Sequence, residues 1–141
     1  MRAYFSRRYR LSASHRLNSD AFNADQNRAV YGKCNNPHGH GHNYVIEVTL
    51  GGPVSAETGM VCDLVDLDAC VRKEVVERFD HMNLNLDPLF QDRVPTTENL
   101  CIEVYRLISD AFNKAELVRV RVEETSNNSF EYPTNALFAG R

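Results

Sequence analysis

The sequence predicts an α+β domain in which an antiparallel sheet is covered on one face by two helices. Strand-like alternation of apolar residues occurs in both terminal thirds of the chain, and two helix-like apolar stripes lie between them. The expected element order is therefore ββααββ. The chain has 141 residues, 43% of them hydrophobic and 25% charged, which suits one ordinary soluble domain spanning residues 1–141.

Two strands separated by a long loop are expected in the first third of the chain. Residues 3–17 alternate loosely and predict a strand ending near His15, whereas residues 18–37 are rich in Asn, Asp, Gly and Pro and predict a loop. The next strand begins at His40, and the Gly-Gly-Pro run at 51–53 is expected to end it. One face of this strand carries His40, His42, Tyr44, Ile46, Val48 and Leu50.

The middle of the chain predicts two helices. A short strand around Met60 to Asp63 is expected to lead into a helix from Asp66 to Phe79, capped by Asp66. Apolar residues recur along it at helical spacing. A second helix is expected to begin near Thr96 or Thr97, with Glu98 in its first turn.

The last two strands are expected at Leu117–Thr125 and Ser129–Tyr132, joined in a hairpin by a turn at Asn127-Asn128. In the first of them Glu124 shares a face with three valines. An acid there has two interpretations. Either the strand end has emerged into solvent, or the carboxylate anchors a ligand by accepting two parallel hydrogen bonds from a planar N–H edge. The alternation leaves both open.

Charge and cysteine content exclude several classes of function. The net charge is −3 and the pI is near 5.9, so no basic field points to nucleic acid or to an anionic membrane. No stretch approaches the roughly 20 apolar residues of a membrane span, and no apolar segment follows the N-terminus as in a signal peptide. The four cysteines form no C-x-x-C pair, so we expect a cytoplasmic protein without a disulfide scaffold.

Three histidines predict a metal site. His40 and His42 lie on one strand face because side chains alternate with a period of two, and His15 on the other strand can complete a set of three imidazoles. Three neutral nitrogens with an open fourth position are typical of catalytic zinc, although other first-row divalent ions also accept imidazole.

Three further residues are candidates for proton transfer. Cys34 precedes His40 by six residues in a loop, where positive charge from Lys33 and a metal would favour its thiolate, although a lone loop cysteine is often incidental. Asp80 and His81 can form a proton-handling pair. Adjacent side chains seldom face each other, so a surface or capping histidine is the alternative.

Six strings together resemble the 6-pyruvoyltetrahydropterin synthase family. They occur in the family's order over roughly residues 5 to 132. The strings are Phe5 with Leu11-Ser12-Ala13-Ser14-His15-Arg16-Leu17, Gly32-Lys33-Cys34-Asn35-Asn36-Pro37-His38-Gly39-His40-Gly41-His42-Asn43-Tyr44, Gly59-Met60-Val61, Asp80-His81-Met82-Asn83-Leu84, Pro95-Thr96-Thr97-Glu98-Asn99 and Glu124-Thr125.

This resemblance implies a tunnelling fold, in which the antiparallel sheets of several subunits close into a barrel. It also implies a homohexamer built as a dimer of trimers, with active sites at subunit interfaces, and a single pterin synthase domain. By motif match, Zn2+ would be held by His15, His40 and His42. Cys34 would be the general base, and Asp80 and His81 would form a relay contributed by a neighbouring subunit. Glu124 would anchor the pterin, assisted by Thr96, Thr97 and Glu98.

The implied activity is the conversion of 7,8-dihydroneopterin triphosphate to 6-pyruvoyltetrahydropterin with release of triphosphate. Lys33 and Arg16 are candidates to meet the triphosphate. His38 departs from the family pattern and adds a histidine that can compete for the metal, and the tail 133–141 lies beyond the resemblance.

Three alternatives compete with this activity. One is the 6-carboxytetrahydropterin synthase of queuosine biosynthesis, which starts from the same substrate and cleaves the side chain. A branch with aldolase-like cleavage carries Glu at the cysteine position, so Cys34 argues against it. The third is a non-enzymatic, zinc-stabilised binding module. It is disfavoured because structural zinc is normally closed by four side chains, and the sequence indicates three.

Overall fold

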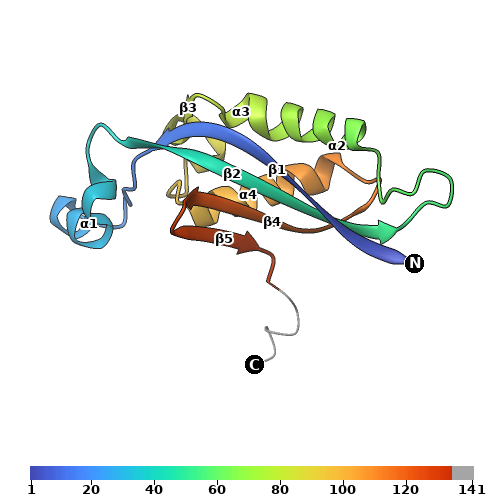
Figure 1. Ribbon diagram of the computed structural model, residues 1–141. Coiled ribbons are helices and arrows are strands. Elements are labelled where there is room, and N and C mark those ends of the chain that lie inside the picture. The colour runs from blue at the N-terminus through green and yellow to red at the C-terminus, as the bar shows by residue number, and fades with distance from the viewer. Residues whose placement is uncertain (135–141) are drawn as a thin grey trace.

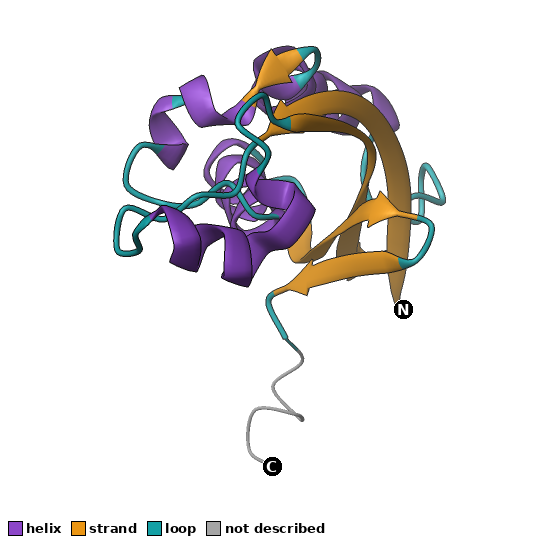
Figure 2. Cartoon of the chain, turned by 90° about the vertical axis from the view of Figure 1, so that its left-hand side faces the viewer, coloured by secondary structure: helices purple, strands orange, loops and turns teal. Residues whose placement is uncertain are grey.

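Five strands form one sheet, and helices α2, α3 and α4 lie on one of its faces (Figures 1 and 2). The computed structural model describes residues 1–134, and the strand order is β3-β1-β2-β4-β5. The elements are β1 (Arg2–His15), α1 (Ala24–Tyr31), β2 (His40–Pro53), α2 (Leu64–Val71), α3 (Glu77–Phe79), β3 (Met82–Asn83), α4 (Thr97–Ala111), β4 (Glu116–Thr125) and β5 (Asn128–Tyr132). The predicted α+β class is confirmed. Of the tail 133–141, residues 135–141 lie outside the described part.

Long antiparallel ladders fix which side chains face each other. β1 and β2 pair from Arg2 opposite Pro53 to His15 opposite His40, so the end of one strand meets the start of the other. β2 also pairs with β4, and β4 with β5. The sheet is not wholly antiparallel as predicted, because the two-residue strand β3 runs parallel to β1 beside Ala13 and Ser14.

The core lies between the sheet and the helices. Alternate residues of β1, β2 and β4 point into it, and burial removes each apolar side chain from water at a gain of roughly 1.5–3 kcal/mol. The fully buried members include Tyr44, Ile46, Val48 and Leu50 of β2, Val120 and Val122 of β4, Leu67 and Val71 of α2, and Leu100, Val104 and Ile108 of α4. The predicted apolar faces are therefore the ones that pack.

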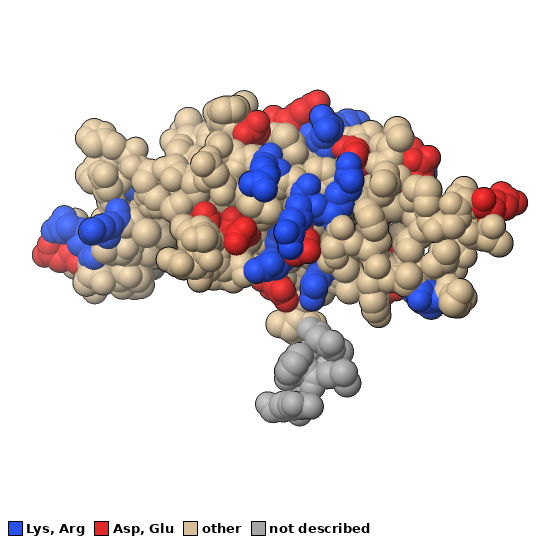
Figure 3. Space-filling view, viewed as in Figure 1, with Lys and Arg blue, Asp and Glu red and all other residues tan. Residues whose placement is uncertain are grey.

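Within residues 1–134, the opposite face of the sheet carries no helix, and it is charged. Figure 3 shows basic side chains gathered across its middle with acidic ones between them. Glu47 of β2 lies between Arg8 of β1 and Arg121 of β4, at 3.8 and 3.6 Å. No described helix has the length and apolar character that a bilayer crossing requires.

Two predictions in the first half of the chain were wrong. The loop expected over 18–37 contains helix α1, because Asn23 and Gln26 form a capping box in which each side chain bonds the other residue's backbone N–H. β2 does not stop at Leu50 but runs through Gly51 and Gly52 and ends at Pro53. Gly51 and Gly52 pair with the start of β1, and long-range pairing outweighs their low strand propensity.

Two further predictions failed at the start of α2 and in the segment just before it. The strand expected from Met60 to Asp63 is irregular, because these residues pair with no strand. The helix begins at Leu64 rather than Asp66, since the carboxylate of Asp63 accepts the Val65 N–H at 2.8 Å and forms the cap. Asp66 lies within the first turn and pairs with Lys114.

Candidate metal centre and active site

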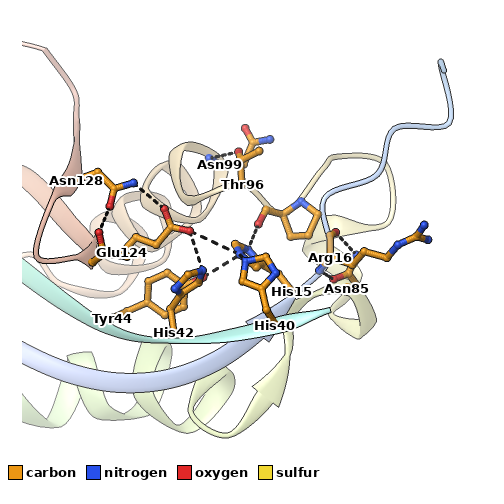
Figure 4. A network of polar contacts seen from close by, with 12 residues as sticks. His15, Arg16, His40, His42, Tyr44, Asn85, Thr96, Asn99, Glu124 and Asn128 are labelled. Carbon is orange, nitrogen blue, oxygen red and sulfur yellow. Dashed lines mark hydrogen bonds and ion pairs between the residues drawn. The ribbon is translucent and has the colours of Figure 1, made fainter. Parts of the chain in front are cut away.

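The three predicted histidines meet at one end of the sheet (Figure 4). His15 is the last residue of β1 and His40 the first of β2, and their Nε2 atoms are 3.1 Å apart. His42 lies two residues further along the same face, with its ring centroid 5.1 Å from that of His15. The cluster thus continues the buried apolar face, as the strand pattern predicted.

Hydrogen bonding fixes the tautomer of His15. Its Nδ1 lies 2.8 Å from the carbonyl oxygen of Pro95, and only an N–H can bond there. Nε2 is therefore left as a lone pair aimed into the cluster. The His15 side chain is 1% exposed, and burial lowers its pKa, with His40 and His42 adding to the effect.

The donor set fits a metal ion. His15, His40, His42 and Glu124 offer ligand atoms that all lie within 4.8 Å of one another, although each imidazole can bond through only a lone pair. Burial lowers the pKa of His42 as well, so neutral rings are favoured. Among the described residues, buried His40 Nδ1 and His42 Nε2 have no partner in hydrogen-bond geometry. Ring nitrogens that converge with a carboxylate in this way form a set of donor atoms suited to a divalent cation.

Glu124 belongs to this cluster. Glu123 pairs with Val45, so Glu124 points to the other face of the sheet, where its Oε1 lies 3.0 Å from His42 Nε2 and 3.7 Å from His15 Nε2. Its side chain is only 14% exposed, and Asn128 donates to Oε2 at 3.1 Å. The interpretation that Glu124 lies at a solvent-exposed strand end is therefore excluded. Glu124 is a fourth side chain close to the histidines, a position that the sequence did not predict.

A buried tyrosine lies beneath the histidines. The Tyr44 hydroxyl is 3.4 Å from His15 Nδ1, and the side chain is fully buried. Burial raises the pKa of Tyr44 well above its usual value, and the charges of Glu124 and of a Cys34 thiolate add to the shift. Glu124 and Cys34 therefore both lie within electrostatic reach of this hydroxyl.

The three candidates at the start of α4 differ in their environments. The Thr96 hydroxyl accepts the Asn99 N–H at 3.2 Å and caps the helix, which begins at Thr97 as predicted. The Thr97 hydroxyl is buried near Tyr44 and has no well-oriented partner among residues 1–134. Glu98 is exposed. Thr97 thus has the hydroxyl most available to a ligand.

The segment from 32 to 39 holds Cys34 beside Leu17, two residues beyond His15, although Cys34 is not one of the four clustered residues. Cys34 lies in a 3₁₀ turn (Gly32–Asn35), half-buried, and its carbonyl accepts the Leu17 N–H at 2.9 Å. Gly39 has φ +71°, and a Cβ there would lie 2.9 Å from the carbonyl oxygen of His15, so the chain can turn into β2 only at a glycine. His38 is exposed and is not one of the four clustered residues.

Asp80 and His81 do contact each other but stand apart from the cluster. Asp80 accepts the Ser12 N–H at 2.9 Å, and His81 Nε2 lies 3.7 Å from Asp80 Oδ2. His81 has φ 60°, a conformation that non-glycine residues seldom adopt, and its side chain is 83% exposed. Strain of this kind is common at functional sites. Within one chain, however, His81 is not brought to the metal ligands.

Sequence reasoning missed the groups that orient the site. Each of these groups makes a hydrogen bond that involves a backbone atom. The Pro95 carbonyl bonds the His15 ring, the buried Asn35 amide bonds the Leu17 carbonyl, and the Asn85 side chain bonds both backbone groups of Arg16. Only the turn-rich composition around 35 and 85 hinted at such amides.

Comparison with known proteins gives consistent matches. A family model described as 6-pyruvoyl tetrahydropterin synthase matches residues 4–135. Relatives named 6-pyruvoyl tetrahydrobiopterin synthase from Poecilia reticulata and Homo sapiens are each 42% identical over 92% of this chain, covering 88% and 90% of theirs. The structure of Caenorhabditis elegans 6-pyruvoyl tetrahydropterin synthase matches with a TM-score of 0.91 and 37% identity, covering 96% of this chain and 97% of that one.

Proposed function

Because the chain belongs to the 6-pyruvoyl tetrahydropterin synthase family, we propose that it converts 7,8-dihydroneopterin triphosphate to 6-pyruvoyltetrahydropterin and triphosphate. It is then a carbon–oxygen lyase acting on phosphate, of the kind needed for tetrahydrobiopterin biosynthesis. The observation that carries this proposal is the convergence of three imidazoles and one carboxylate at a single sheet end.

We assign His15, His40 and His42 as ligands of a zinc ion. The Pro95 carbonyl keeps the His15 proton on Nδ1, and burial keeps His15 and His42 neutral, which is the state a ligand requires. A zinc ion held by these residues would supply Lewis-acid chemistry, which would acidify the C–H and O–H groups of the substrate side chain.

Glu124 is assigned to the pterin rather than to the metal. A carboxylate that accepts two parallel hydrogen bonds matches the aminopyrimidinone edge of a pterin ring. Its nearest partners, His42 Nε2 and Asn128, are single contacts that a ligand edge can replace. Thr97, whose buried hydroxyl lacks a well-oriented partner among residues 1–134, would add a bond to the ring, with Thr96 and Glu98 at its margin.

Cys34 is assigned as the base that removes a proton from the substrate side chain, and His81 as the group that returns one. Asp80 lies 3.7 Å from His81 and would orient its ring. Since His81 is not among the clustered residues of its own chain, the relay is assigned to a neighbouring subunit. Lys33 and Arg16 stay candidates to meet the triphosphate.

The sheet edges support assembly into a homohexamer. Among the described residues, β3 covers only Ala13 and Ser14 of the outer edge of β1, and β5 has no partner on its outer side. Edges left unpaired in this way invite strand pairing with another chain. Closure of such sheets into a barrel would bring the Asp80–His81 pair of one subunit towards the histidines of the next.

Mass spectrometry of the anaerobic reaction tests the proposal. Zinc-loaded protein is incubated with 7,8-dihydroneopterin triphosphate, and we expect a product that keeps all three side-chain carbons, with free triphosphate. Acetaldehyde and a one-carbon carboxylate would instead indicate the 6-carboxytetrahydropterin reaction. Unchanged substrate, together with unfolding on zinc removal, would favour a structural metal. Cys34→Ala should abolish turnover, whereas Cys70→Ala, at a half-buried thiol of α2, should not.

A further inference from the structure

We propose that Asn35 is a positioning residue that holds Cys34 against the end of β1, an inference that rests on the proposed role of Cys34 as base. Asn35 directly follows Cys34, and its side chain is buried, with the residue 6% exposed. Its amide nitrogen donates to the carbonyl oxygen of Leu17 at 2.7 Å and to Oδ1 of Asn18 at 3.0 Å. Both hydrogens of the amide are thereby used on the segment that follows β1.

The backbone on either side of Asn35 completes this attachment. The Leu17 N–H donates to the Cys34 carbonyl at 2.9 Å, so Leu17 bonds through both of its backbone groups. Arg16 Nε donates to the Asn35 carbonyl at 3.2 Å. Residues 34 and 35 are therefore fixed to residues 16–18, as a short extra strand would be.

The segment to which Asn35 binds is itself fixed. It begins one residue after the metal ligand His15, which is locked to the Pro95 carbonyl. Asn85 accepts the Arg16 N–H at 2.7 Å and donates to the Arg16 carbonyl at 2.9 Å from the opposite side. The Asn35 amide thus holds the Cys34 thiol at a fixed position relative to His15.

Loss of the Asn35 amide should affect the reaction more than the fold. A base displaced by about 1 Å can cost on the order of 100-fold in rate, because proton transfer requires close approach. The metal ligands and Glu124 do not bond to Asn35, so metal binding and recognition of the pterin ring should persist. Asn27 gives a matched comparison. It is a buried amide in the same region, but its Nδ2 bonds to the carbonyls of Ser19, Phe22 and Asn23.

The experiment compares Asn35→Ala with Asn27→Ala as full-length, zinc-loaded proteins. For Asn35→Ala we expect kcat to fall about 10- to 100-fold, with zinc affinity within about threefold of wild type. Mass spectrometry of iodoacetamide labelling should show Cys34 alkylated at least about fivefold faster, with Cys70 unchanged as internal reference. Asn27→Ala should leave kcat and Cys34 labelling within about twofold of wild type. Equal effects of the two substitutions on kcat and on Cys34 labelling would overturn the proposal.

Two measurements guard against ambiguous outcomes. If Asn35→Ala does not fold, Asn35→Leu keeps a similar shape, removes both donated hydrogens without adding a charge, and should give the same labelling change. In the wild-type protein, NMR should show slow exchange of the Asn35 side-chain amide hydrogens, and fast exchange would overturn the proposal without any variant. If the wild type does not turn over the substrate, the proposed function fails, while labelling and exchange still decide the role of Asn35.

Discussion

Replacing Glu124 by glutamine separates its two possible roles. The carboxylate lies 3.0 Å from His42 Nε2, and the side chain is 14% exposed. It is therefore close enough to be a fourth metal ligand or the anchor of a pterin ring. Glutamine keeps the size and one acceptor oxygen, but turns an N–H donor towards the ring. Hydrogen bonds to charged groups contribute about 1.5–3 kcal/mol each, so we expect a loss of roughly 2–4 kcal/mol in substrate recognition.

That loss corresponds to a fall in kcat/KM of about 30- to 1,000-fold. Zinc affinity, measured by competition with a chelator, should fall by no more than about 10- to 100-fold, which is the usual cost of losing a group that neighbours the metal ligands. His42→Ala should lower it by more than about 100-fold. Glu123→Gln is the matched control, since Glu123 points to the other face of the sheet and should leave both quantities unchanged. A loss of zinc affinity in Glu124→Gln equal to that of His42→Ala would refute the reasoning.

Three further predictions concern stability and assembly. The metal-free protein should lose stability as pH falls below about 6.5. The unfolded chain then binds protons at His15 and His42, whereas in the folded protein burial lowers the pKa of both rings and keeps them unprotonated. Thermal melts from pH 8 to 5.5 check this, and a Tm that does not change with pH would contradict it. Asp68→Ala removes the acceptor of three hydrogen bonds from β1, so urea unfolding should show a loss of about 1–2 kcal/mol, and no loss would mean that this network is fully replaced by water. Cys34→Ala and His81→Ala should each be inactive alone but regain activity when unfolded and reassembled together; no recovery would place both residues in one subunit's site.

Prediction from sequence succeeded where the pattern is local. Alternation within strands put His40, His42 and Tyr44 on one face and Glu124 on the valine face, and the structure has these parities. It failed where long-range pairing overrides local propensity, as in the Gly-Gly-Pro run that continues β2. It also failed for α1, whose capping box at Asn23 and Gln26 is a local signal within a segment of loop-like composition.

The sequence alone therefore determined the candidate ligands, the acid on the apolar face and the fold class, because a side chain's face depends only on its position along its own strand. Only the tertiary structure decided that His15 lies opposite His40, that the Pro95 carbonyl sets its tautomer, and that Asn35 fixes Cys34. These contacts join residues 18 to 80 positions apart, through strand register and backbone groups that every residue carries. The residue types alone do not predict such a contact, so only the folded structure reveals it.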